Sequence, residues 1–317
     1  MMSMTDMAKT LQGRDFLALR DYSPEELLYL LDLADWLKKM HKEHRPHALL
    51  AGKTLGLIFQ KSSTRTRVSF EAGMVQLGGY PMFLSAQDLQ MGRGEPIKDT
   101  ARVLARYLDG IMIRTFHHAD VEELASYADI PVINGLTDSL HPCQVMADLM
   151  TIREHKGKDL KGLKMTYIGD GNNMAHSLMM GAAKMGMEIM IASPSGYMPE
   201  ESFIMEAKAV ADSTGGLVQI TTDIDLAAKK ADVLYADVWA SMGQEEEAKE
   251  RMQALSSYQI NGNLLKLAAK DAIVMHCLPA HRGEEVTDEV LEGPQSVIFD
   301  EAENRMHAQK AVLAALL

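Results

Sequence analysis

One short segment of the sequence combines three hydroxyl groups with two guanidinium groups. The run Ser63-Thr64-Arg65-Thr66-Arg67 follows an apolar stretch that predicts a strand, and it opens a helical pattern that ends near Gly78. The first turn of a helix has free N–H groups and the positive end of the helix dipole, and an arginine fork matches two phosphate oxygens. The run therefore predicts a site for a small phosphate-containing anion. The plainer alternative is a hydroxyl cap followed by surface arginines.

The region around this run is basic, although the chain as a whole is acidic. Between Ala51 and Thr115 there are nine Lys and Arg residues against five Asp and Glu residues, a net charge of +4, whereas the whole chain of 317 residues carries −12. The overall acidity argues against a nucleic-acid or membrane-surface binder, because those partners require a basic face. The local excess favours a small anion site.

Polar residues also follow predicted strands in the second half of the sequence. The run GDGNN contains Asn172 and Asn173, but a dinucleotide fingerprint would need a third glycine where Met174 stands. The paired amides fit better as hydrogen-bonding partners for the polar end of an amino acid. Asp237 ends another predicted strand and could pair with a ligand ammonium group, or it could be an ordinary turn or cap carboxylate.

The two cysteines, Cys143 and Cys277, are too few for a disulfide framework and lack the spacing of metal ligands, which predicts a reducing cytoplasm and no metal. Cys277, in the run HCLP, could be a buried apolar thiol. It could also be a nucleophile with His141 or His276 as its base, although His141 could equally be a structural helix cap.

No membrane segment or leader is expected from the sequence. The chain has no run of 18 or more apolar residues, and its first 15 residues lack the apolar stretch of a signal peptide.

These chemical groups must be positioned by elements that alternate along the chain. A capping box of Ser23, Pro24 and Glu26 predicts the start of a helix. Beyond it, apolar strand patterns alternate with helical ones, which predicts an α/β fold of parallel sheets with helices on both faces. The expected strands are Thr54–Gln60, Tyr80–Ser85, Gly110–Thr115, Pro131–Leu136, Lys164–Gly169, Glu188–Ser193, Val218–Thr222, Val233–Val238, Ala272–Cys277 and Val297–Asp300.

The two sets of strands predict two domains joined by helices. We expect the first domain over residues 4–148 and the second over 149–302, with a C-terminal helix over 303–317 returning to the first domain. The connecting helix should begin at His141-Pro142 and end near Gly157. Since ligands bind beyond the carboxyl ends of parallel strands, the polar runs after the strands are the candidate sites.

Taken together, these runs resemble the aspartate/ornithine carbamoyltransferase family. The similarity extends along almost the whole chain in the runs STRTR, DLQMGRGE, HPCQ, GDGNN, DVWASMG, HCLP and EAENR, together with Arg114. The cysteines of HPCQ and HCLP distinguish the chain from the aspartate branch of the family. The run SMG resembles the ornithine branch and not the putrescine branch.

The resemblance implies two substrate sites and an assembly of one or more homotrimers. Carbamoyl phosphate is expected to bind Ser63, Thr64, Arg65, Thr66, Gln90, Arg114, His141, Gln144, Arg305 and the backbone of Cys277 and Leu278. In the family, the residue matching Gln90 lies in a loop near a subunit interface. Ornithine is expected to bind Asn173, Asp237, Ser241 and Met242.

The implied reaction is attack by the uncharged δ-amine of ornithine on the carbonyl carbon of carbamoyl phosphate, giving citrulline and phosphate without a metal or an organic cofactor. Thr66, Arg114 and His141 would donate to the carbonyl oxygen, and Arg65 and Arg305 would stabilise the departing phosphate. Cys277 would either accept the amine proton or only orient the amine. HCLP is expected to contain a cis peptide before its proline.

Four other interpretations remain open at this point. A related transferase could act on putrescine, aspartate or acetylornithine. A catalytically inactive relative could serve as a binding subunit, although intact STRTR, HPCQ and HCLP runs argue against it. A nicotinamide dehydrogenase or a cysteine hydrolase has little support beyond GDGNN or Cys277 alone.

Overall fold

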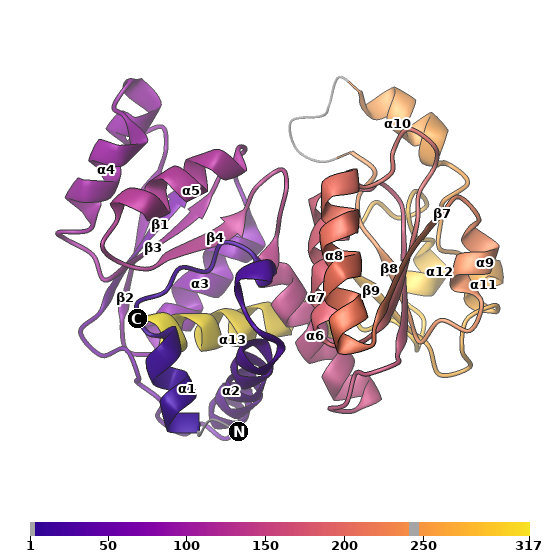
Figure 1. Cartoon of the computed structure of the whole chain (residues 1–317), viewed down its shortest axis with the longest axis horizontal. Coiled ribbons are helices and arrows are strands. Elements are labelled where there is room, and N and C mark those ends of the chain that lie inside the picture. The colour runs from indigo at the N-terminus through magenta and orange to yellow at the C-terminus, as the bar shows by residue number, and fades with distance from the viewer. Residues whose placement is uncertain (1–3, 241–246) are drawn as a thin grey trace. The chain divides into compact units, whose positions relative to one another are not determined.

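The computed structural model describes residues 4–240 and 247–317, and its chain divides into two compact units. The first unit comprises residues 1–150 and 303–317, and the second comprises 151–302. The chain passes into the second unit within helix α6 (Pro142–Lys156) and back within helix α13 (Ile298–Leu316). Figure 1 colours these elements by their place in the sequence.

The first unit is built on a parallel four-stranded sheet in the order β2-β1-β3-β4. Its strands are β1 (Thr54–Phe59), β2 (Tyr80–Ser85), β3 (Gly110–Arg114) and β4 (Val132–Leu136). Its remaining helices are α1 (Met4–Leu11), η1 (Leu19–Asp21), α2 (Pro24–Lys42), α3 (Thr64–Gln76), η2 (Gln90–Arg93), α4 (Ile97–Leu104) and α5 (His118–Tyr127).

Helices cover both faces of this sheet, as predicted. Ile58 and Ile111 pack in one apolar cluster with Ala101 of α4 and Leu124 of α5. The alternate residue Leu57 is also fully buried, so the opposite face is covered as well. Figure 1 shows α4 and α5 on one side of the sheet and α3 and α13 on the other.

The capping box predicted at the start of α2 is confirmed. The Ser23 hydroxyl accepts the Glu26 N–H at 3.2 Å, and the Glu26 carboxylate accepts the Ser23 N–H at 2.8 Å. Two of the otherwise unpaired N–H groups are thereby satisfied, with Pro24 at the first helical position.

The second unit contains a parallel five-stranded sheet in the order β7-β6-β5-β8-β9. Its strands are β5 (Lys164–Ile168), β6 (Glu188–Ala192), β7 (Leu217–Thr221), β8 (Val233–Ala236) and β9 (Ile273–His276). Its remaining helices are α7 (Asn173–Lys184), α8 (Glu201–Thr214), α9 (Ile224–Ala228), α10 (Ala248–Leu255), α11 (Gly262–Leu265) and α12 (Asp288–Leu291). Two parallel sheets with helices confirm the predicted fold class.

The predicted strand Val297–Asp300 is wrong. Helix α13 already begins at Ile298, and only an isolated bridge joins Val274 to Ser296. A short apolar run such as VIF has no periodicity that separates strand from helix, and the helix-favouring residues that follow extend the helix backwards over it. The other nine predicted strands are present, with ends that differ by no more than two residues.

Candidate active site

The sheet topology indicates where each unit can bind a ligand. In the first sheet, β2 lies on one side of β1, and β3 and β4 lie on the other side. The strand order therefore reverses direction between the neighbouring strands β1 and β3. In the second sheet it reverses in the same way between β5 and β8. Ligands of open α/β sheets bind beyond the carboxyl ends of such strands. The run STRTR and Arg114 follow or end the first pair, and GDGNN and Asp237 follow the second pair.

The run STRTR forms the N-terminal end of α3. Ser63 is the N-cap, and its hydroxyl accepts the Thr66 N–H at 3.2 Å and lies 3.1 Å from the Thr66 hydroxyl. The first N–H groups of a helix have no intrahelical acceptor, so those of Thr64 and Arg65 remain suited to an anion. Thr64 is exposed and Arg65 is half-buried, so both can be reached from solvent.

A buried arginine from the far end of the chain completes this region. Arg305 of α13 is 4% exposed, and its guanidinium donates to the Thr66 hydroxyl at 3.1 Å and to the Gln144 side-chain oxygen at 2.7 Å. Gln144 in turn donates to the Asp148 carboxylate at 2.8 Å. Three predicted site residues from three helices are thus joined by hydrogen bonds.

Arg114 and His141 lie in the same unit, and both are buried. Burial, followed by the charges of Arg305 and Arg114, holds the pKa of His141 well below its usual value. The imidazole is therefore neutral near pH 7, with one ring N–H to donate. A neutral donor at this position suits an oxygen that acquires negative charge.

Two further residues of this unit are Gln90, which is predicted to contact carbamoyl phosphate, and Cys143. Gln90 begins the short helix η2 and is exposed. The Cys143 thiol is buried and lies 3.3 Å from the Asn134 carbonyl oxygen, and burial raises its pKa to about 12. Cys143 is therefore a structural thiol.

The second unit brings together a carboxylate, an amide and a thiol. Asp237 follows β8 and is 6% exposed. One carboxylate oxygen accepts the Cys277 thiol at 2.9 Å and the Val238 N–H at 2.8 Å, and the other accepts the Asn172 amide at 2.8 Å. This network of Asn172, Asp237 and Cys277 joins the ends of β5, β8 and β9.

The predicted ornithine contacts include Asn173, whereas the amide that donates to Asp237 in the structure belongs to Asn172. The Asn172 side chain caps α7 by accepting the N–H groups of Met174 and Ala175 at 2.9 and 3.4 Å. An asparagine directly before a helix was the available signal. Asn173 is the first helical residue and is largely buried. Ser241 and Met242 lie outside the described residues.

His276 positions the turn that carries Cys277, and it does not act on the thiol. Its Nδ1 accepts the Leu278 N–H at 2.9 Å, so Nε2 carries the proton and faces Glu285 at 3.1 Å. Of the two histidines considered as bases for Cys277, His276 is thus excluded by its hydrogen bonds. Leu278 has φ +58°, an unusual conformation for a branched residue, and the expected cis peptide joins it to Pro279.

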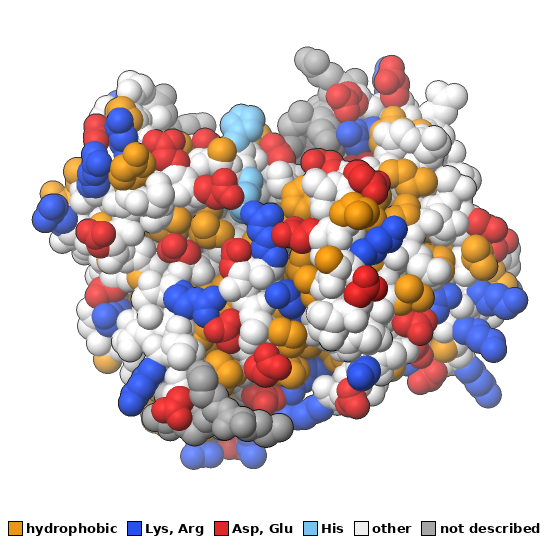
Figure 2. Space-filling view, in the orientation of Figure 1, with side chains coloured by type: hydrophobic (Ala, Val, Ile, Leu, Met, Phe, Trp, Pro, Cys, Tyr) orange, Lys and Arg blue, Asp and Glu red, His pale blue; other side chains and the backbone are white. Residues whose placement is uncertain are grey.

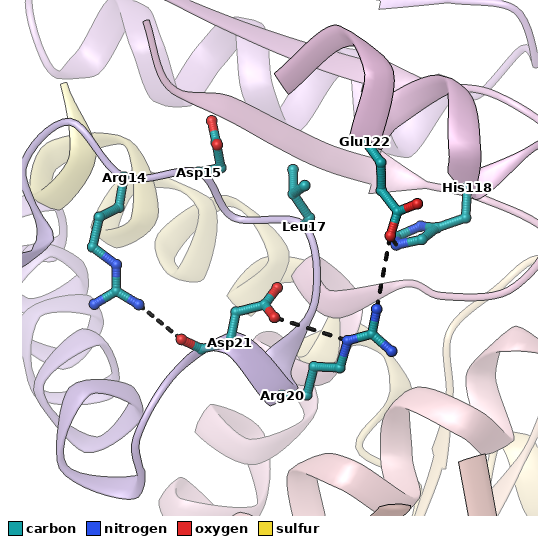
Figure 3. A pocket seen from close by; sticks show the side chains of 7 residues that line it. All are labelled: Arg14, Asp15, Leu17, Arg20, Asp21, His118 and Glu122. Atoms are coloured by element: carbon teal, nitrogen blue, oxygen red, sulfur yellow. Dashed lines mark hydrogen bonds and ion pairs between the residues drawn. The ribbon is translucent and has the colours of Figure 1, made fainter. Parts of the chain in front are cut away.

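A pocket in the first unit is lined by none of the predicted site residues. Figure 3 shows Arg14, Asp15, Leu17, Arg20, Asp21, His118 and Glu122 around it. Arg14 donates to the Asp21 carbonyl oxygen at 2.8 Å, and Arg20 lies 3.8 Å from both the Asp21 and Glu122 carboxylates. Its charges compensate one another, so we assign it no substrate.

Figure 2 shows Lys and Arg interspersed with Asp and Glu over the face in view.

Among the described helices, none combines the length and apolar character that a membrane crossing requires.

The fold and the two polar networks define a class: an α/β enzyme with one unit arranged for an anion and a second unit that presents a carboxylate and a thiol. The chain belongs to the aspartate/ornithine carbamoyltransferase family. Residues 14–154 match its carbamoyl-P binding domain, and residues 161–316 match its Asp/Orn binding domain.

Individual relatives agree with this assignment over nearly the whole chain. Ornithine carbamoyltransferase of Oceanobacillus iheyensis is 61% identical over 307 residues, covering 97% of this chain and 95% of that protein. The enzyme of Pyrococcus furiosus named "ornithine carbamoyltransferase, anabolic" is 56% identical over 311 residues, 98% of both chains.

Solved structures show the same fold. Ornithine carbamoyltransferase from Pyrococcus furiosus superposes with a TM-score of 0.94 at 56% identity, covering 96% of this chain and 97% of that one. The enzyme from Thermus thermophilus gives a TM-score of 0.85 at 41% identity, covering 96% and 98%.

Proposed function

We infer that this protein is an ornithine carbamoyltransferase, which transfers the carbamoyl group of carbamoyl phosphate to the δ-amine of L-ornithine and releases L-citrulline and phosphate. The observation that carries this inference for the amine substrate is the buried Asp237 carboxylate hydrogen-bonded to the Cys277 thiol. A carboxylate beside a titratable thiol suits an ammonium group that must lose a proton before it reacts.

Carbamoyl phosphate is proposed to bind the first unit at the start of α3. Ser63, Thr64 and Arg65, with the helix N-terminus, would hold the phosphate, since hydroxyls, N–H groups and a guanidinium all donate to its oxygens. Thr66, Arg114 and the neutral His141 would donate to the carbonyl oxygen. Gln144 and Arg305 support Thr66 through the hydrogen bonds described above. Roles for Gln90 and for the backbone of Cys277 and Leu278 stay predictions.

Ornithine is proposed to bind the second unit through Asn173 and Asp237, with Ser241 and Met242 as further predicted contacts outside the described residues. The δ-amine is largely protonated in water, because an alkylammonium titrates near pKa ~10. Asp237 would attract the charged amine, and Cys277 lies within hydrogen-bond distance of that carboxylate. The amine first loses one proton, to the Cys277 thiolate or to solvent. The nitrogen then forms a bond to the carbonyl carbon, the bond from that carbon to the phosphate oxygen breaks, and a second proton of the nitrogen leaves with the departing phosphate.

The protein's contribution is position and charge. Phosphate is a good leaving group, so the chain mainly has to align the two reactants and stabilise the tetrahedral intermediate. This reaction needs no electron transfer, and every group it requires is an amino-acid side chain or a backbone N–H.

Product formation with separate amines tests the assignment. We expect citrulline from carbamoyl phosphate and ornithine, and little or no product from putrescine, aspartate or acetylornithine at equal concentration. Turnover with a different amine would keep the carbamoyl phosphate site and overturn the assignment of ornithine. Binding of carbamoyl phosphate with no turnover of any amine would indicate an inactive relative.

We further propose that the chain self-associates, as the expected homotrimer requires. The edge strand β2 exposes Tyr80, Met82 and Phe83, and the adjacent helix α3 exposes Val68 and Val75. An exposed apolar edge strand can pair with another chain. We propose that a second copy of this chain covers the surface formed by β2 and α3. Sedimentation velocity would show a species of three chains or a multiple of three, and a monomer at micromolar concentration would contradict the proposal. The cytoplasmic location stays a prediction.

A further inference from the structure

The turn after β9 contains a fully buried carboxylate of which only one oxygen is hydrogen-bonded. Glu285 is 0% exposed, and its Oε1 lies 3.1 Å from His276 Nε2 and accepts the His281 N–H at 2.6 Å. Its Oε2 is buried and has no hydrogen-bond partner within residues 4–240 and 247–317. Burying a carboxylate oxygen without a hydrogen-bond partner costs free energy. No described side chain supplies that partner, which points to a bound ligand.

Two further ligand-type side chains converge on that oxygen. His281 Nδ1 lies 3.9 Å from Glu285 Oε2 and 3.8 Å from Glu284 Oε2, and the three ligand atoms lie within 4.8 Å of one another. These separations are too long for hydrogen bonds. Around a metal with ligands at about 2.1 Å, tetrahedral neighbours lie about 3.4 Å apart, so small rotations of the accessible His281 and Glu284 would close the set.

The backbone holds these three residues in a fixed turn. The Glu284 N–H donates to the His281 carbonyl at 2.9 Å, and the Gln259 amide donates to the carbonyls of Gly283 and Glu284 at 2.8 Å each. Gly283 has φ +88°, which glycine adopts without strain. The ligand positions are therefore organised before any ion binds.

The nearest cation in the sequence does not neutralise the cluster. The Arg282 guanidinium is bound to the carboxylates of Asp288 and Glu292, the latter at 2.6 Å. The two carboxylates of Glu284 and Glu285 thus remain available to a positive ligand. One imidazole and two carboxylates, without a thiolate, suit a divalent ion of borderline character.

We propose that His281, Glu284 and Glu285 bind one divalent transition-metal ion of the Zn²⁺ or Co²⁺ type, with water in the remaining positions. The site is connected to the proposed active site by two hydrogen bonds. Glu285 holds His276, and His276 accepts the Leu278 N–H at 2.9 Å in the turn that carries Cys277. An ion on Glu285 Oε2 therefore fixes this carboxylate–histidine pair and stabilises the turn. The proposal does not depend on which amine the enzyme uses.

Co²⁺ is the probe, because its visible spectrum reports its ligands. The full chain without a histidine tag would be titrated with Co²⁺ by absorption and by equilibrium dialysis, and its apparent Tm would be measured with and without the ion. We expect one Co²⁺ per chain, no thiolate charge-transfer band and a higher Tm with Co²⁺, since binding to the folded state raises Tm.

Four variants separate this site from alternatives. His281→Ala and Glu284→Gln change accessible side chains and should weaken Co²⁺ binding by at least about tenfold and abolish the Tm increase. His117→Ala, at an exposed histidine of the first unit, should bind as the unchanged chain does. Cys277→Ser should also bind normally. Equal binding by His281→Ala, no binding by the unchanged chain, or a charge-transfer band that disappears in Cys277→Ser would each overturn the proposal.

Discussion

The polar networks of the two units differ in how far the protein satisfies them by itself. At the start of α3, the first helical N–H groups and the half-buried Arg65 have no acceptor among the described side chains, and Arg305 adds a buried positive charge. At the end of β8, by contrast, both Asp237 oxygens already accept hydrogen bonds, from Asn172, Cys277 and a backbone N–H. The donors of the first network therefore suit an anionic ligand, whereas both oxygens of Asp237 in the second network already accept hydrogen bonds.

This contrast predicts different responses to substitution. Removing a charge from the first network removes an interaction that the ligand itself makes, so the loss should be large and specific. A substitution in the second network that keeps its hydrogen bond should leave the fold intact and affect only the ligand's proton or orientation.

The largest effect is expected for Arg65→Ala. It should lose at least about 2 kcal/mol of transition-state stabilisation, a fall of about 30-fold in kcat/KM, because a charge-assisted contact to phosphate disappears. Steady-state citrulline formation with carbamoyl phosphate varied measures this fall.

Arg67→Ala is the matched control on the same helix. Arg67 is exposed, pairs with Glu71 at 2.9 Å and lies over the Phe83 ring, so its loss should change kcat/KM by less than about threefold. Equal losses of kcat/KM for the two arginines would mean that α3 contributes only its general positive charge. That result would contradict the specific role assigned to Arg65 in the first network.

An intermediate effect is expected for Cys277→Ser. Serine can still donate to Asp237, so carbamoyl phosphate affinity should be unchanged, while kcat or ornithine affinity falls by at least about tenfold. If the thiolate accepts the amine proton, the fall should lie in kcat. If the thiol only orients the amine, the fall should lie mainly in the KM for ornithine.

Cys143→Ser provides the control for thiol chemistry. Cys143 is buried with a raised pKa and should affect apparent Tm more than turnover. An unchanged rate and unchanged ornithine affinity in Cys277→Ser would remove Cys277 from the mechanism.

The smallest expected effect is a change in stability with pH. As pH rises, one buried group in the first unit becomes more stabilising and one in the second unit becomes less stabilising. His307 of the first unit is fully buried, and burial, with Lys310 and Lys38 nearby, lowers its pKa to about 3. The folded state therefore favours the neutral ring, and its stabilising contribution is complete above pH ~6.5 and declines as pH falls toward about 3. Asp170 of the second unit has a pKa raised to about 6 by burial despite its ion pair with Arg251, so its ionisation destabilises that unit as pH rises from about 4 to about 6.

His307→Leu tests the first of these signs. In the part of the chain that the structure describes, neither ring nitrogen of His307 has a hydrogen-bond partner, so an apolar side chain of similar size is tolerated. Between pH 6.5 and 5.5, protonation linked to His307 should lower the free energy of unfolding of the unchanged chain by about 1 kcal/mol. In His307→Leu this contribution is absent, so the decrease over the same pH interval should be smaller by about 1 kcal/mol. Apparent Tm at the two pH values, with His117→Leu as an exposed control, measures the difference. An identical pH response would show that His307 titrates normally.

Local sequence signals were sufficient for much of the fold. The Ser23 capping box and the Ser63 cap were readable because their hydrogen bonds join residues three positions apart. The inner strands β1, β3, β5 and β8 were readable because they are buried on both faces and therefore form continuous apolar runs, whereas the edge strands β2 and β7 are partly exposed. The exception, Val297–Asp300, failed because a run of four residues is too short to show a period.

The candidate sites were only partly readable. GDGNN predicted paired amides beyond a strand, but only the structure distinguishes them: Asn172 caps α7 and donates to Asp237, and Asn173 is the first helical residue. A role for Asn173 in ornithine binding stays a prediction. His276 could have been a base for Cys277 until its two ring nitrogens were found bound to Leu278 and Glu285. No local pattern contains this information, because a tautomer depends on partners brought in by the fold.

By itself, the sequence determined the alternation of strands and helices, the capped start of α3 and the family, because each depends on residue types at short spacings or on the order of motifs. Only the tertiary structure decided that Arg305 donates to Thr66, 239 positions away, and that Asp237 accepts the Cys277 thiol across 40 positions. It also decided that Glu285 is buried with one oxygen unpaired. Hydrogen bonds between distant residues form only when apolar burial has packed their helices and strands together, and packing is a property of the whole chain.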